Sequence, residues 1–206
     1  MGAGVPRRLP HPPARRPVPR SAAESADLHR RARAEAHRIA RGLSPEALAW
    51  SPGTGAWSIA DCLDHLHRAA EGFVPALDRA VARGRARGRR GGAPQRYGLV
   101  ARKMVGGMGS GEVALKTGAA LDPARSPEAS GAEPGAGLAW LDADTARYVA
   151  VCERAEGLDL ARVKARYPFA PLVRLPLGAM LEISGLHALR HVRQMERVTA
   201  APSFPA

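Results

Sequence analysis

The sequence predicts an all-α protein, a four-helix bundle with long connectors and a disordered N-terminal arm. Four stretches carry apolar residues at helical spacing, and the segments between them are rich in glycine and proline. No stretch alternates apolar and polar residues convincingly enough to predict a sheet. Helices with one apolar stripe bury that stripe against one another, so a bundle is the simplest architecture for this pattern.

We expect residues 1–22 to form a flexible arm and residues 23–200 to form the helical domain. The first 20 residues contain six prolines and five arginines, with almost nothing to bury. The prolines interrupt every apolar stretch, so the arm lacks the apolar core of a secretory signal.

The first two helices are expected over residues 25–41 and about 59–82. Apolar residues recur at spacings of three and four along both stretches. Ser58 is placed to cap the second helix, with Asp61 three residues later as its capping-box partner. Pro75 lies within the second helix and is expected to kink or break it.

The stretch from residue 84 to about 135 is expected to be a flexible connector. It contains the string GGMGSG, which resembles a phosphate-binding loop only superficially because no lysine and hydroxyl follow at the required spacing. Helical spacing returns from Leu138 to about Gly157. After a link with three prolines, the last helix is expected over about residues 177–198.

The net charge of +12 lies mainly in two segments. Residues 1–20 carry five arginines and residues 83–96 carry six, neither with an acidic residue. Basic runs without apolar periodicity are usually solvated tails or loops, and aromatic residues for base stacking are nearly absent from both segments. Nucleic-acid binding is therefore not expected from this charge.

Cysteine content and hydropathy indicate where in the cell the protein is expected to be located. Cys62 and Cys152 are too few for a disulfide framework, so a reducing, cytoplasmic location is expected. No apolar run approaches the length of a membrane span, so no association with a membrane is expected.

The last helix contains the candidate metal ligands. His187 and His191 are four residues apart, so both imidazoles project from one helix face and can reach one ion. Gln194 follows on the same face, where it could hydrogen-bond a ligand. Such a pair also arises by chance and is often only a pair of core histidines. A metal site needs a third ligand from another helix, for which His65 is the candidate.

Two motifs together resemble a known family. PGTGAWSIADCLDHL spans the start of the second helix, and PLGAMLEISGLHALRHVRQMERV ends the helical part of the chain. They resemble the DinB-like superfamily, whose members commonly show Pro…Trp-Ser, then Asp/Glu-x-x-x-His-Leu, and finally Pro-Leu-Gly leading to His-x-x-x-His-x-x-Gln. The residues that match are Trp57, Ser58, Asp61, His65, Leu66, Pro176, Leu177, Gly178, His187, His191 and Gln194. The resemblance covers about residues 25–199.

The resemblance implies a four-helix bundle that holds one divalent metal ion, zinc or nickel, often within a homodimer. By carry-over from the family, the ligands are His65, His187 and His191. Characterised relatives include S-transferases and isomerases that use small bacterial thiols, and others are described as metal-dependent hydrolases. We therefore expect an enzyme with a small-molecule substrate, first a transferase that uses a low-molecular-weight thiol. The alternatives are a metal-dependent hydrolase and a non-catalytic metal-binding or interaction bundle.

Asp61 is the candidate catalytic residue, because it lies one helical turn before His65 and could move a proton. The alternative is that Asp61 serves only the helix cap.

Overall fold

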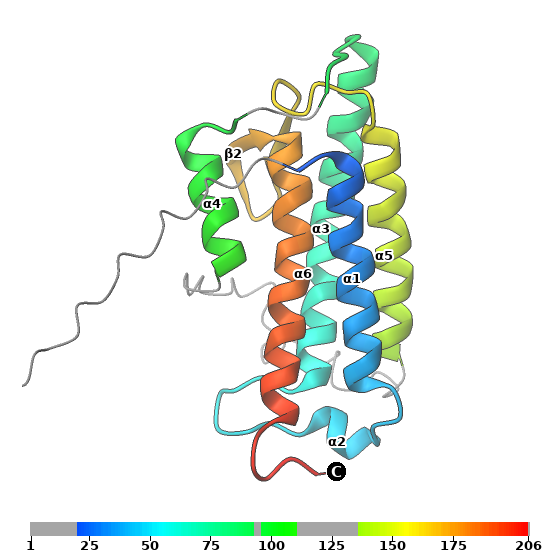
Figure 1. Ribbon diagram of the computed structural model, residues 1–206, viewed down its shortest axis with the longest axis vertical. Helices are drawn as coiled ribbons and strands as arrows, with labels where there is room; N and C mark the ends of the chain where they lie inside the picture. The colour runs from blue at the N-terminus through cyan, green and yellow to red at the C-terminus, as the bar shows by residue number, and fades with distance from the viewer. Residues whose placement is uncertain (1–19, 93–95, 111–135, 206) are drawn as a thin grey trace, which may run out of the picture.

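The computed structural model describes residues 20–92, 96–110 and 136–205. Four long helices lie side by side: α1 (Ala22–Ala40), α3 (Ile59–Ala86), α5 (Ala136–Ala155) and α6 (Leu177–Thr199) (Figure 1). α1 packs against α5 and α6, and α3 packs against the same two helices. The predicted four-helix bundle is confirmed. Nearly all of the expected arm, residues 1–19, lies outside the described residues.

Helix α6 is the most deeply buried element, because it contacts α1, α3 and α4 (Leu99–Ser110) at once. Its first ten residues are all buried, so this first part of the helix has no exposed polar face. Close packing with α1 is possible because Gly185 offers no side chain where Leu28 approaches. None of the described helices combines the length and the apolar character that crossing a membrane requires.

Helix α3 begins at a capping box and continues past an internal proline. Ser58 caps it and forms the predicted capping box with Asp61. The helix is not broken at Pro75 and continues to Ala86, beyond the expected end. A proline removes one helical hydrogen bond, but Val74 and Leu77 beside it are buried in the core, and this packing holds the helix together.

Two short helices lie where the sequence predicted links. α2 (Pro45–Ala49) is a single turn capped by Ser44. α4 lies within the stretch that was expected to be a flexible connector, and that expectation is wrong for residues 99–110. Glycines lowered the helical signal of α4, yet Ala101, Val105 and Met108 are buried on the face that packs against α6.

A β-hairpin precedes α6, whereas the sequence predicted only a proline-containing link. β1 (Lys164–Tyr167) pairs antiparallel with β2 (Ala170–Pro176). Ala165 and Leu175 are buried, while Arg166 and Arg174 are exposed, which is the inside–outside alternation of a half-buried hairpin. The two strands are too short, and too rich in arginine and proline, to be recognised from sequence.

The second basic segment is also partly folded, contrary to expectation. Arg83 and Arg85 belong to the last turns of α3. The segment that follows is tied to the end of α5 by backbone hydrogen bonds, from Gly91 N to Gly157 O (3.1 Å) and from Asp159 N to Arg89 O (2.9 Å). These arginines therefore lie on a folded surface and not in a flexible connector.

Candidate metal centre

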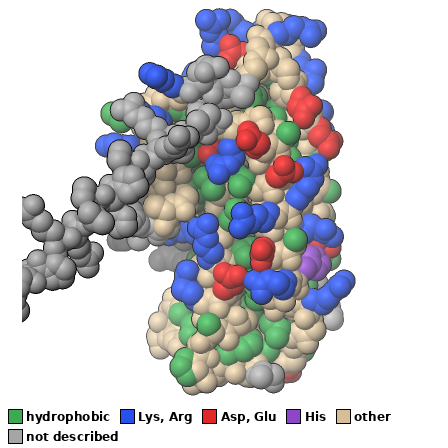
Figure 2. Space-filling view, viewed as in Figure 1, with side chains coloured by type: hydrophobic (Ala, Val, Ile, Leu, Met, Phe, Trp, Pro, Cys, Tyr) green, Lys and Arg blue, Asp and Glu red, His purple; other side chains and the backbone are tan. Residues whose placement is uncertain are grey.

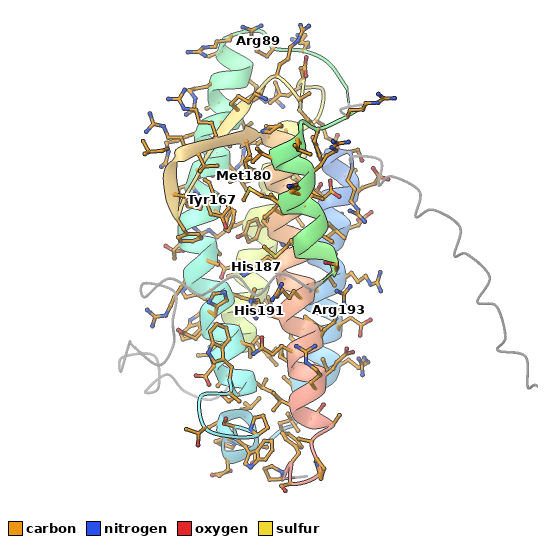
Figure 3. The ribbon with its side chains drawn as sticks, turned by 90° about the vertical axis from the view of Figure 1, so that its left-hand side faces the viewer. Arg89, Tyr167, Met180, His187, His191 and Arg193 are labelled. Atoms are coloured by element: carbon orange, nitrogen blue, oxygen red, sulfur yellow. The ribbon has the colours of Figure 1, made fainter. Side chains whose placement is uncertain are left out.

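The three predicted ligands lie together between α3 and α6. Nε2 of His65 is 3.1 Å from Nε2 of His187, and Nε2 of His191 is 3.2 Å from the same atom. Figure 3 shows His187 and His191 pointing from α6 toward the neighbouring helix, partway along the bundle. The helical spacing of four residues places two rings one above the other, and α3 supplies the third across the interface.

The spacing of these nitrogen atoms suits one metal ion. Zinc–imidazole bonds of 2.0–2.1 Å in a tetrahedral site put ligand nitrogens about 3.3 Å apart. The two measured separations are within about 0.2 Å of that value. Potential ligand atoms of all three histidines lie within 4.8 Å of one another. The donor set therefore fits a divalent ion held by three imidazoles.

Burial keeps two of the rings neutral. Removal from water, together with the smaller effect of the neighbouring His65, lowers the pKa of His191 to about 3. Burial likewise holds the pKa of His187 well below its ordinary value, with His191 and His65 adding to the effect. A neutral imidazole keeps a lone pair for a metal, so this environment favours ligation over protonation.

The orientation of His191 is set by its neighbour one turn along α6. Nδ1 of His191 donates to Oε1 of Gln194 at 3.1 Å, as the spacing predicted. With the proton on Nδ1, the lone pair of Nε2 points toward His187 and His65. Gln194 thereby fixes the tautomer that a ligand needs.

Trp57 covers the centre from the loop before α3. Its ring is stacked on His191, with centroids 5.6 Å apart and planes 18° apart, and its centroid is 4.8 Å from that of His65. The surface on which it packs is formed by two of the candidate ligands.

Asp61 occupies the cap of α3. Its Oδ2 accepts hydrogen bonds from the backbone N–H and the hydroxyl of Ser58, both at 2.8 Å. The capping alternative is thus realised, and a role in proton transfer stays a prediction.

Cys62, next to Asp61, is buried, and burial raises the pKa of its thiol well above the ordinary value. It therefore has no thiolate character at neutral pH.

A polar layer formed by His29, Tyr148 and Ser184 lies behind His187 and was not predicted from the sequence. His29 on α1 lies 3.1 Å from the Ser184 hydroxyl and stacks on Tyr148, with ring centroids 4.0 Å apart. A small cavity of about 20 Å³ between these residues and His187 is large enough for one water molecule. No signal in the sequence singled out His29, because its neighbours on α1 follow an ordinary apolar stripe.

A second group of potential ligands, His67, Glu71 and Asp144, is better explained as an ion-pair network. Nδ1 of His67 lies 2.8 Å from Asp144, and Arg147 bridges Asp144 and Glu71. The arginine already compensates the two carboxylates. His67 is thus partly buried between α3 and α5.

Comparisons with known proteins bear on the family and the fold. Residues 28–195 match the family model of the DinB superfamily. A solved structure of YfiT from Bacillus subtilis, described as "a probable metal-dependent hydrolase with an unusual four-helix bundle topology", is similar with a TM-score of 0.59 and 12% identity. The match covers 100% of this chain and 97% of YfiT. No curated protein matches the sequence significantly. The chain belongs to the DinB superfamily.

Proposed function

We propose that this protein is a divalent-metal enzyme whose ligands are His65, His187 and His191. The observation that carries the proposal is the convergence of three Nε2 atoms, from helices far apart in sequence, at separations of 3.1 and 3.2 Å. Zinc and nickel both accept imidazole ligands, and either ion suits this set.

The chain's own residues would hold and shape the centre. Three protein ligands, not four, are the pattern of catalytic sites, which keep a position for substrate. A bound divalent cation supplies Lewis acidity, which makes a water or a thiol nucleophilic at neutral pH. Gln194 keeps the lone pair of His191 directed inward, and Trp57 shields the faces of two ligand rings from water.

The finer proposal is a small-thiol-dependent S-transferase. Three imidazole ligands would leave the full 2+ charge of an ion uncompensated, and this charge would favour a thiol in its anionic form. The thiol must come from a small molecule, because Cys62 and Cys152 are both buried. In this scheme Asp61, one turn before His65 on α3, accepts the thiol proton.

A metal-dependent hydrolase is the second candidate, favoured by the similarity in fold to YfiT and the description of that protein. The same centre serves both reactions, with water taking the place of the thiol. A metal-binding bundle without catalysis would share the ligands and show neither activity.

Elemental analysis of purified protein tests the metal proposal. We expect about one equivalent of metal in the wild type, and little in His65→Ala, His187→Ala or His191→Ala. His67→Ala is the matched control, since His67 lies on α3 beside His65 but pairs with Asp144. Metal that survives all three ligand substitutions would refute the assignment.

Turnover separates the two enzyme classes. An electrophilic probe consumed only when a small thiol is added indicates the transferase, and consumption without thiol indicates the hydrolase. In either case activity should disappear in His187→Ala and persist in His67→Ala. Metal binding without turnover, with or without added thiol, would indicate the non-catalytic metal-binding bundle.

A further inference from the structure

A second hollow lies far from the histidines, at the end of the bundle where α3 ends. This basic pocket, of about 390 Å³, is formed by the last turns of α3, the segment after it and the base of the β1–β2 hairpin. Figure 3 places Arg89 at this end of the molecule, well separated from His187 and His191. Figure 2 shows Lys and Arg side chains gathered at the same end. Its seven basic lining residues are Arg83, Arg87, Arg89, Arg162, Lys164, Arg166 and Arg174.

The frame of the basic pocket is fixed by close backbone packing. Val163 N donates to Asp159 O at 3.0 Å, and Leu177 N donates to Val163 O at 2.8 Å, which ties the hairpin base to the start of α6. A Cβ on Gly84 would lie 2.9 Å from a methyl carbon of Val163, so glycine allows α3 and the hairpin to approach this closely. The basic side chains therefore stand on a rigid support.

The positive charge of this pocket is almost uncompensated. Within the described residues, only Arg162 among the seven has an ion pair, a long one of 3.7 Å to Asp159. Arg83 and Lys164 donate to backbone carbonyls, not to carboxylates. Arginines elsewhere on the bundle do find acidic partners, such as Arg147 with Asp144. The pocket thus concentrates cations where the fold places hardly any anion.

Two of these cations oppose each other directly. Arg166 of β1 is the register partner of Arg174 of β2, and both side chains are exposed. Like charges in directly opposite positions destabilise an antiparallel pair. A bound anion between them would turn this repulsion into attraction, and the guanidinium fork matches the oxygens of a phosphate.

We propose that the basic pocket binds a small anion carrying two or more phosphate groups. Its volume lies in the range of small-molecule sites, about 300–1,000 Å³. No aromatic side chain lines it, so the bases of a nucleic acid would find no stacking surface. A concave ring of cations also suits a compact diphosphate better than an extended polymer.

Calorimetric titration with inorganic pyrophosphate at fixed ionic strength tests this proposal. We expect binding by the wild type and at least about tenfold weaker binding by the double variant Arg166→Gln/Arg174→Gln. The matched control is Arg31→Gln/Arg102→Gln, which removes the same charge from exposed positions on α1 and α4 and should bind as the wild type does. ADP in place of pyrophosphate distinguishes the source of the diphosphate: tighter binding indicates a nucleotide, and equal binding indicates a free diphosphate.

The stability of the double variant provides a second measurement. Without ligand it should melt at the same or a higher temperature than the wild type, because a like-charge pair has been removed, so weaker binding cannot be attributed to unfolding. Three results would overturn the proposal: equal loss of binding in the control, loss of binding in His187→Ala, or duplex DNA that binds more tightly than pyrophosphate at physiological salt. The second result would place the anion at the histidines, and the third would make the surface a nucleic-acid site.

Discussion

Nε2 of His65 on α3 lies 3.1 Å from Nε2 of His187 on α6, although 122 positions separate the two residues in the chain. Two ring nitrogens this close need a proton or a cation between them, since their lone pairs otherwise repel. His191 brings a third nitrogen to the same point, and burial disfavours protonation of both α6 histidines. A metal ion would satisfy all three at once and would also link α3 to α6.

Because the ion would join two helices, removing it should lower thermal stability. A ligand present at 100 times its dissociation constant stabilises the folded state by about 2.7 kcal/mol. For a chain of 206 residues this corresponds to a fall in Tm of roughly 5–10 °C on treatment with a chelator. Differential scanning calorimetry provides the measurement. His187→Ala should show no response to chelator, and an equal response in that variant would contradict the linkage.

Gln194→Ala should weaken metal binding without abolishing it. The substitution removes the acceptor that holds His191 in its Nδ1-protonated form. Loss of such an outer partner typically reduces metal affinity by about 10–100-fold. Competition with a chromophoric chelator measures this loss. Gln194→Glu retains an acceptor oxygen and should restore most of the affinity, whereas full affinity in Gln194→Ala would mean that packing alone orients the ring.

Asp61→Asn separates the helix cap from proton transfer. Asp61 and Ser58 share the capping box, so Ser58→Ala should cost about 1 kcal/mol of unfolding free energy in urea titrations. Asp61→Asn should cost less, because asparagine retains an oxygen that accepts from Ser58. If Asp61 also accepts a proton, kcat should fall by about 10²–10⁴ in Asp61→Asn alone. Equal, small changes in kcat for the two variants would restrict Asp61 to the cap.

Gly185→Ala tests the close approach of α1 and α6. An added Cβ would lie 2.6 Å from Cβ of Leu28, so the helices must move apart. Overpacking of this kind costs about 1–3 kcal/mol, which urea unfolding would report. Gly106→Ala on α4 is the matched control, because nothing lies within 4 Å of its added Cβ and alanine favours a helix. A Gly185→Ala protein as stable as the wild type would show that α1 shifts at little cost.

The sequence predicted the bundle and the candidate ligands because both leave periodic or fixed-spacing signals. The four-residue spacing of His187 and His191 does not depend on the connectors between helices. A capping box such as that of Ser58 with Asp61 depends only on residues three positions apart. The partnership of His65 with the other two came from a family resemblance, since no local rule relates residues on separate helices.

The elements that were missed depend on tertiary contacts. Helix α4 has three buried residues but a glycine-rich sequence, so its stability comes from packing on α6 and not from propensity. The arginine run that begins at Arg83 looked like a solvated segment in the sequence. The packing of the hairpin against α3 brings three of its members, Arg83, Arg87 and Arg89, to one pocket. His29 gave no signal because a buried histidine has no characteristic spacing.

His29 should make stability depend on pH. Burial lowers its pKa from an unfolded value near 6.5 to about 3, so the folded state resists the proton that the unfolded state accepts. This contribution is fully present above pH 6.5 and is lost as the pH falls toward 3. Between pH 7 and pH 5 it removes about 2 kcal/mol, and His187 and His191 act in the same direction.

Urea unfolding at pH 7 and pH 5 of the wild type and His29→Gln isolates the part due to His29. The variant should lose about 2 kcal/mol less than the wild type over this interval, because glutamine has no proton to gain. His37→Gln is the matched control on the same helix: His37 is only partly buried and lies 2.7 Å from Asp142. A pH dependence unchanged in His29→Gln would mean that the folded protein accommodates the charged ring, and the polar layer behind His187 would then have to be open to water.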